Sequence, residues 1–427
     1  MDNIENSISK LHKYHINIFL ICLFAIGIFT PFILNKYLLF ICSVGFLFFI
    51  NTIKIWRKCL FKNKLFMWCT VLFCIELLYR ILGISSAAIG NYALRFLTYI
   101  SVWMYIYIYT CIPLKGHYFI VRFSILVILL NLINNIKTYK SYPELRGTGV
   151  LTNVDYLNSL GILNLGSTSF SYVILFLGIF SFYIFLLKIN SYKGLIYFIL
   201  FIFFSIYILY YTGSGTIILS FISFIFLVLI FYRRKKIKLF KLFIFTVLFL
   251  ILLKVFNKFF FNIIYVLEPF VGKKVATRCL VILNIFNGNY SLSNKVYLSR
   301  IYFLIFNFKV WLSSIENFIL GNGYHTYSGL SIEEALIKTG DGGHSGFGDL
   351  IPRYGILGLS ICINITKNIF CLKNYCRTER KYNLFFILFM IFLFNNIFND
   401  IMTYDIIFIL LVFYPLILWK EQNLNAK

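Results

Sequence analysis

The sequence predicts an all-α polytopic membrane protein, because of its composition, the length of its apolar runs and the distribution of its charge. Of the 427 residues, 60% are hydrophobic and 13% are charged, whereas soluble domains average about 45–50% and about 25%. Apolar runs of about 16–22 residues recur along the chain, and a helix needs roughly 20 residues to cross a bilayer. A water-soluble protein is therefore excluded.

The apolar runs favour helices over a membrane β-barrel. Barrel strands alternate lipid-facing and polar residues over ~10 positions, but a run such as 220–232 is largely apolar on every side. About twelve spans are expected, at 17–34, 37–53, 65–82, 92–112, 118–136, 167–187, 194–211, 216–232, 239–257, 351–370, 383–398 and 402–419.

The distribution of basic residues predicts the orientation of these spans. Lys and Arg number 24 on the side that holds both termini and 6 in the other short connectors and flanks. Cytoplasmic connectors carry such an excess, so both termini are expected in the cytoplasm. The net charge of +25 then reflects topology and contact with anionic headgroups, and no nucleic-acid partner is needed to explain it.

The spans divide the chain into three parts: residues 1–257 with nine spans, a long extracytoplasmic loop over 258–350, and 351–427 with three spans and the C-terminus. A loop of that length usually has a function. A second polar connector on the same side, 137–166, is expected to cover an outward-facing cavity together with the long loop.

The long loop is expected to contain short helices. Residues 297–312 show helical apolar spacing and predict an amphipathic helix at the membrane interface. Gly321-Asn322-Gly323 predicts a turn at its end, and Ser331 to Glu334 could cap a further short helix. His344 stands where a helical stretch could begin, a position that attracts phosphate and disfavours protonation of imidazole. The alternative is that His344 satisfies a turn amide.

Several of these segments together resemble a known family. They are Arg300, Trp311, Phe318 to Tyr324, His344 to Phe347 and Tyr354 to Gly358, preceded by Arg146 to Gly149. In this order they are similar to the pattern of the O-antigen polymerase and ligase superfamily. Two positions depart from it: Gly215 stands where the family has an arginine, and Ser345 where it has an asparagine.

The resemblance implies a fold related to the GT-C glycosyltransferases and a membrane glycosyltransferase activity. The implied reaction transfers a saccharide from undecaprenyl diphosphate to a sugar hydroxyl, building an O-antigen or capsule on the outer face of the bacterial cytoplasmic (inner) membrane. Membrane lipids, a flippase and a chain-length regulator are the implied partners. No cofactor is expected.

The resemblance also implies roles for individual residues. His344 is the candidate base and Arg300 the candidate diphosphate clamp, the alternative for Arg300 being an arginine that reaches lipid headgroups. The other candidate substrate-binding residues are Arg146, Arg278, Arg353, His325 and Arg95.

Two further expectations concern charged side chains. His325, Asp341, His344 and Asp349 match no ligand motif in their spacing, so no metal site is expected. Glu76 and Arg80 are four residues apart in one span and are expected to pair.

Three function classes remain open from the sequence. A polymerase of lipid-linked repeat units comes first, a ligase that moves finished glycan second, and a flippase for lipid-linked oligosaccharide third. Transporters hold their polar sites near the bilayer midplane and often contain repeats. The chain shows no convincing repeat and its polar residues gather in one loop, which favours an enzyme.

Overall fold

The structure is a computed structural model. It describes residues 15–16, 18–27, 64–85, 114–142, 168–212, 215–231, 251, 255, 257–271, 276–277, 280, 298–323, 346–371 and 379–398. Every regular element within these ranges is helical. In the described part of the chain, three helical stretches are long and apolar enough to cross a membrane: Tyr118–Ser141, Phe170–Leu187 and Tyr192–Tyr211. An all-helical chain with several apolar helices of membrane-spanning character is therefore confirmed for this part of the protein.

The helices follow the apolar runs closely. They are α4 (Lys64–Ile81), α6 (Leu114–Ser141), α8 (Thr168–Leu187), α9 (Tyr192–Ile206), the π-helical turn η3 (Tyr207–Tyr211), α10 (Gly215–Phe231), α12 (Asn257–Val271), α14 (Leu298–Trp311), α15 (Ile315–Ile319), α17 (Leu350–Cys371) and α18 (Glu379–Phe398). A shorter apolar helix covers Ile18–Gly27. The spans expected at 37–53, 92–112 and 402–419, and most of 239–257, lie outside the described residues.

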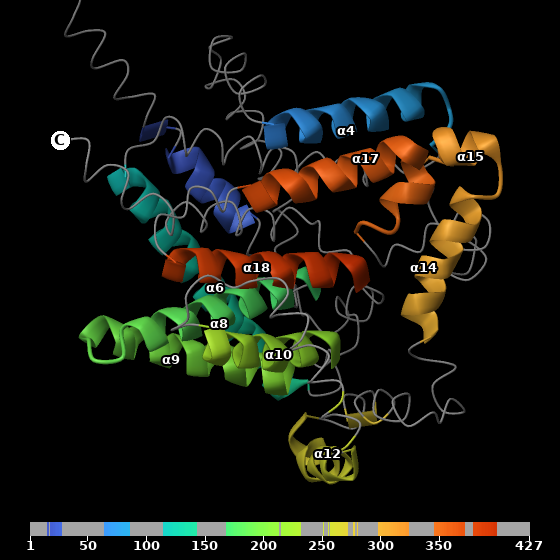
Figure 1. Ribbon diagram of the computed structural model, residues 1–427. Helices are drawn as coiled ribbons and strands as arrows, with labels where there is room; N and C mark the ends of the chain where they lie inside the picture. The colour runs from blue at the N-terminus through green and yellow to red at the C-terminus, as the bar shows by residue number, and fades with distance from the viewer. Residues whose placement is uncertain are drawn as a thin grey trace, which may run out of the picture.

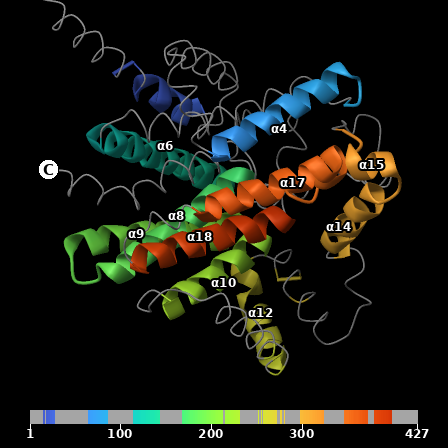
Figure 2. The same cartoon turned by 45° about the horizontal axis from the view of Figure 1, so that its top comes forward.

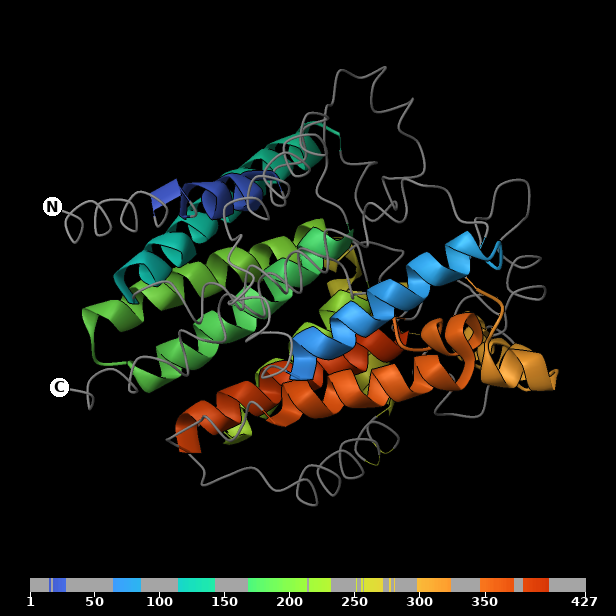
Figure 3. The same ribbon diagram turned by 90° about the horizontal axis from the view of Figure 1, so that it is seen from above.

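Among the described helices, most run side by side, whereas α12, α14 and α15 run in other directions (Figure 1). Helix α17 contacts α4 and α18, and α8 contacts α9, α10 and α18. At one end of this bundle lie α14 and α15, which Figure 3 shows from above beside the ends of α4 and α17. Helix α12 runs across the bundle direction and projects beyond α10, as Figure 2 also shows.

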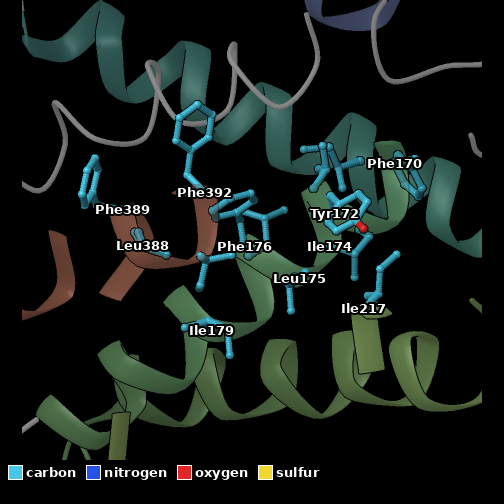
Figure 4. Packing of buried hydrophobic residues seen from close by; sticks show 14 of the residues in the cluster. Phe170, Tyr172, Ile174, Leu175, Phe176, Ile179, Ile217, Leu388, Phe389 and Phe392 are labelled. Carbon is cyan, nitrogen blue, oxygen red and sulfur yellow. The ribbon is translucent and has the colours of Figure 1, made fainter. Parts of the chain in front are cut away.

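Helix α8 is the centre of the packing. Its residues are buried around the whole circumference, including Ile174, Phe176 and Ile179. Figure 4 shows Phe176 facing Leu388 and Phe392 of α18, while Ile179 points to the opposite side of α8. A helix that is apolar all round belongs in a core of this kind.

Helix α9 has the opposite environment, because much of its apolar surface faces outward. Leu195 and Ile199 are 53% and 58% exposed, which in a membrane means contact with acyl chains. The turn between α8 and α9 is tight: Ser191 caps α9 by accepting a hydrogen bond of 3.1 Å from the amide of Gly194. The two helices therefore lie antiparallel.

Candidate functional site

Buried polar residues gather at one end of the bundle. This polar end is formed by the C-terminal ends of α4, α6, η3 and α18, the N-terminal ends of α8, α10 and α17, and helix α14. Its buried polar residues are Glu76, Ser85, Asn131, Asn135, Ser171, Thr212, Ser220, Asn307, Asp349, Arg353, Asn395 and Asn396. Among the described residues, the other buried polar side chains are Ser124, Ser181 and Asn383. The positive-inside pattern predicts that the polar end is extracytoplasmic.

Polar contacts join α10, α18 and the segment before α17 at this end. The Ser220 hydroxyl donates to Asn395 Oδ1 at 3.2 Å. The amide of Phe347 donates to the carbonyl of Asn396 at 3.3 Å. The segment that follows His344 is therefore held against the end of α18.

A buried carboxylate joins α14 to the start of α17. Asn307 Nδ2 of α14 donates to Asp349 Oδ1 at 3.1 Å, and Arg353 Nη2 lies 3.8 Å from Asp349 Oδ2. Asn307, Asp349 and Arg353 are 0%, 1% and 3% exposed. Because a buried charge is costly without hydrogen bonds or a counter-charge, this arrangement stabilises the contact between the two elements. Arg353, a candidate diphosphate clamp, thus faces a carboxylate in this structure.

A second buried carboxylate connects α4 to α17. The Tyr354 hydroxyl donates to Glu76 Oε1 at 2.8 Å, and the two side chains are 0% and 2% exposed. The ring of Tyr79 meets that of Tyr354 edge to face at 5.5 Å, and the Tyr79 hydroxyl donates to the Leu320 carbonyl.

Arg80 is exposed and donates to the carbonyl of Ser85 at 3.2 Å. The expected pairing of Glu76 with Arg80 stays a prediction, while the contact with Tyr354 was not expected.

Close backbone contacts lock α15 onto α17. Helix α17 is broken at Gly355, whose φ of 57° is left-handed. A Cβ atom on Gly355 would lie 2.5 Å from the Ile319 carbonyl oxygen, and one on Gly321 would lie 2.6 Å from the Arg353 carbonyl oxygen.

Backbone hydrogen bonds also join the two elements. The amides of Asn322 and Gly323 donate to the carbonyls of Pro352 and Arg353 at 2.7 and 2.9 Å. Gly321 and Gly323 both have a left-handed φ, so the chain leaves helical structure at the predicted glycine segment, although α15 lies between this segment and the end of α14. The amides of the segment bind carbonyls that the break in α17 leaves available.

The helix predicted over 297–312 is present as α14, and its buried face contacts α17. Asn307, Val310 and Trp311 are buried on this helix, whereas Ile305 is 55% exposed. Trp311 stacks on Phe318 at 5.1 Å and its Nε1 donates to the Phe318 carbonyl at 3.0 Å. The pair folds α15 back against the end of α14.

Arg300 lies on α14 seven residues before Asn307, and positions with this spacing share one face of a helix. The side chain of Arg300 lies outside the described residues. So do the other candidate site residues except Arg353, namely His344, His325, Arg146, Arg278 and Arg95. Helix α14, which carries Arg300, and residues 346–349, which follow His344, lie at the same end of the bundle.

A π-helical turn lies immediately before the glycine motif that contains Gly215. Residues 207–211 form this turn, and Asn135 Nδ2 donates to the Tyr207 hydroxyl at 3.5 Å. Such turns are rare and often lie at functional sites. The sequence patterns did not single out Asn135 or Asn307, and they included Tyr354 only as the first residue of the Tyr354 to Gly358 segment. The available signal was a polar or tyrosine side chain within an apolar helix, which is costly unless it is bonded.

In the ranges that the structure describes, no three His, Cys, Asp or Glu side chains come together as a metal site. Of the four residues considered for a metal, only Asp349 falls in those ranges. Comparison with protein-family models finds no match for the chain. Comparison with curated proteins finds none either.

Proposed function

We propose that the protein polymerises undecaprenyl-diphosphate-linked oligosaccharide units into a surface polysaccharide. The observation that carries the proposal is the hydrogen bond between Asn307 and Asp349. It holds the helix that carries Arg300 against the segment that follows His344. The family resemblance assigns these two residues the clamp and the base.

Chain geometry limits how far apart the two positions can be. His344 precedes Asp349 by five residues, a separation that spans at most about 18 Å. Arg300 lies about 10 Å along α14 from Asn307, since a helix rises about 1.5 Å per residue. A donor that carries a diphosphate and several sugar rings can contact both positions at once.

The proposed reaction is an inverting displacement at the anomeric carbon of the donor. The acceptor hydroxyl oxygen forms the new glycosidic bond, and the bond from the anomeric carbon to the lipid diphosphate breaks. The diphosphate leaves with the electron pair, and the proton of the acceptor hydroxyl moves to the neutral imidazole of His344. A positioned base contributes roughly 10²- to 10⁴-fold, and the Arg300 guanidinium neutralises the charge that grows on the diphosphate.

The proposal places this chemistry outside the cytoplasmic membrane, in a chain of about twelve spans with both termini inside. Two observations support this orientation. The distribution of Lys and Arg predicts which helix ends are extracytoplasmic, and the same helix ends hold most of the described buried polar residues. A flippase would instead need polar groups near the bilayer midplane. The described polar residues therefore favour the enzyme.

Complementation of a strain that lacks the gene tests the proposal. Arg300→Ala and His344→Ala should insert normally and reduce the surface glycan to single repeat units. Lys309→Ala is the matched control, because Lys309 is an exposed basic residue of the same helix that lies over the Phe306 ring at 5.6 Å. Long glycan from both Arg300→Ala and His344→Ala would refute the roles. Lipid-linked units missing from the outer leaflet of the null strain would indicate a flippase.

A further inference from the structure

Helix α12 carries all its charged and amide residues on one face and none on the other. With about 100° between successive residues, Phe259, Phe260, Ile263, Ile264, Val266, Leu267, Phe270 and Val271 fall within one continuous arc. The opposite arc holds Lys258, Asn262 and Glu268 together with Phe261, Tyr265 and Pro269. The separation is that of a helix which lies at a boundary between an apolar and an aqueous phase.

Both arcs have exposed members. Phe259 and Val266, seven residues apart on the apolar arc, are 61% and 70% exposed. Lys258 and Asn262 of the polar arc are also exposed. Large apolar side chains exposed next to one another on a helix of this kind mark an interaction surface.

The position of α12 selects the partner. Helix α12 contacts η3, the turn at the polar end of the bundle. Figures 1 and 2 show it crossing the direction of the apolar helices and projecting sideways beyond α10. A helix that leaves a membrane-embedded bundle sideways at the level of the helix ends enters the boundary between headgroups and acyl chains.

We propose that α12 is an interfacial helix that binds the surface of the lipid bilayer beside the polar end. Phe259 and Val266 enter the acyl region, while Lys258 and Asn262 stay among the headgroups. Lys258 adds electrostatic attraction to anionic lipid. Tyr265 lies at the centre of the polar arc and is also exposed, so it faces away from the acyl region. This inference does not depend on the proposed catalytic activity.

Photo-crosslinking to lipid tests this placement without disturbing the native cysteines. p-Benzoylphenylalanine is introduced singly at positions 259, 266 and 265 of the full chain, and at Ile222, which is 55% exposed on the apolar helix α10. Position 265 is the control on the polar arc. Each purified protein is reconstituted into vesicles of phosphatidylethanolamine and phosphatidylglycerol and irradiated. Lipid adducts on the α12 and α10 peptides are then measured by mass spectrometry.

Positions 259 and 266 should give about five-fold or more acyl-chain adduct than position 265, which lies about 100–120° round the helix from them. Their yields should approach that at position 222. Equal yields at 265 and 266 would overturn the proposal. Crosslinks at 259 and 266 to a second copy of the chain would also overturn it, in favour of a protein interface. Two apolar positions are used so that the test remains valid if one of these proteins fails to insert.

Discussion

Glu76 shows how a single buried carboxylate can be accommodated within an apolar helix. Its side chain is 2% exposed and accepts a hydrogen bond from Tyr354 on a helix far away in sequence. A Tyr hydroxyl can donate to a carboxylate or to a neutral amide oxygen. The contact therefore depends on an acceptor at this position.

We expect Glu76→Gln to preserve most of the stability and Glu76→Leu to lower it. Leucine would leave the buried Tyr354 hydroxyl without this acceptor, which costs about 1–3 kcal/mol. Thermal unfolding of the purified protein in detergent measures the difference. If Glu76→Leu unfolded at the same temperature as Glu76→Gln, the hydrogen bond would have no role in holding α4 to α17.

Asn307 is neutral, and this matters because its partner is the Asp349 carboxylate. Asn307→Ala removes a donor to a charged group, and Asn307→Asp places a second carboxylate beside the first. We expect Asp to be worse than Ala, and Ala worse than the native residue, with about 1.5–3 kcal/mol for the lost hydrogen bond. Unfolding temperature and glycan length measure the two effects, and Lys309→Ala on the same helix is the control. A stable Asn307→Asp protein that makes long glycan would contradict this order.

At the scale of elements, the break in α17 is imposed by packing and not by local sequence. Gly355 has a left-handed φ, and a Cβ atom there would lie 2.5 Å from a carbonyl oxygen of α15. Gly178 is a suitable comparison, since it lies in α8 and its added Cβ would come no closer than 3.3 Å, to the Phe221 ring. The two glycines thus separate a clash with backbone from a tight contact with a side chain that can move.

We expect Gly355→Ala to destabilise the protein by about 1–3 kcal/mol or more, because it combines a strained φ with the clash. Gly178→Ala should be close to neutral, because the Phe221 ring need yield only slightly. Thermal unfolding and glycan synthesis are measured for both. Native behaviour of Gly355→Ala would show that α15 and α17 are not locked as described.

Helix positions could be predicted from sequence because apolar runs define them. The run at 65–82 became α4 (Lys64–Ile81), and the amphipathic run at 297–312 became α14 (Leu298–Trp311). The break at Gly355 could not be predicted, since it depends on Gly321 and Ile319, more than thirty residues earlier. The π-helical turn at 207–211 was missed for a related reason, because apolar periodicity does not report a local change of hydrogen-bond spacing.

The candidate site was predictable only in its local parts. The Gly321–Gly323 turn could be predicted from residue types, but its partners at Pro352 and Arg353 could not. The same holds for Asn307, whose contact with Asp349 brings together residues that no local pattern relates. Sequence patterns therefore indicated which segments carry the site, and packing determined how they meet.

At the scale of the whole molecule, the two ends of the bundle differ in character. The turn between α8 and α9 contains exposed residues such as Asn190, and the turn between α14 and α15 contains exposed Ser313. Figure 1 shows the two turns at opposite ends. If the bundle spans a membrane, they must face opposite aqueous phases.

Labelling of single cysteines from outside the cell tests this arrangement. In a chain whose ten native cysteines are replaced by alanine, Ser313→Cys should react with a membrane-impermeant maleimide in intact cells. Asn190→Cys should react only after permeabilisation, because the positive-inside pattern places the α8–α9 turn in the cytoplasm. Reaction of both from the same side would show that the bundle does not cross the membrane as a unit. Exchanged accessibilities would keep the bundle intact but place Asn307 and Asp349 in the cytoplasm, where the proposed outer-face polymerisation could not occur.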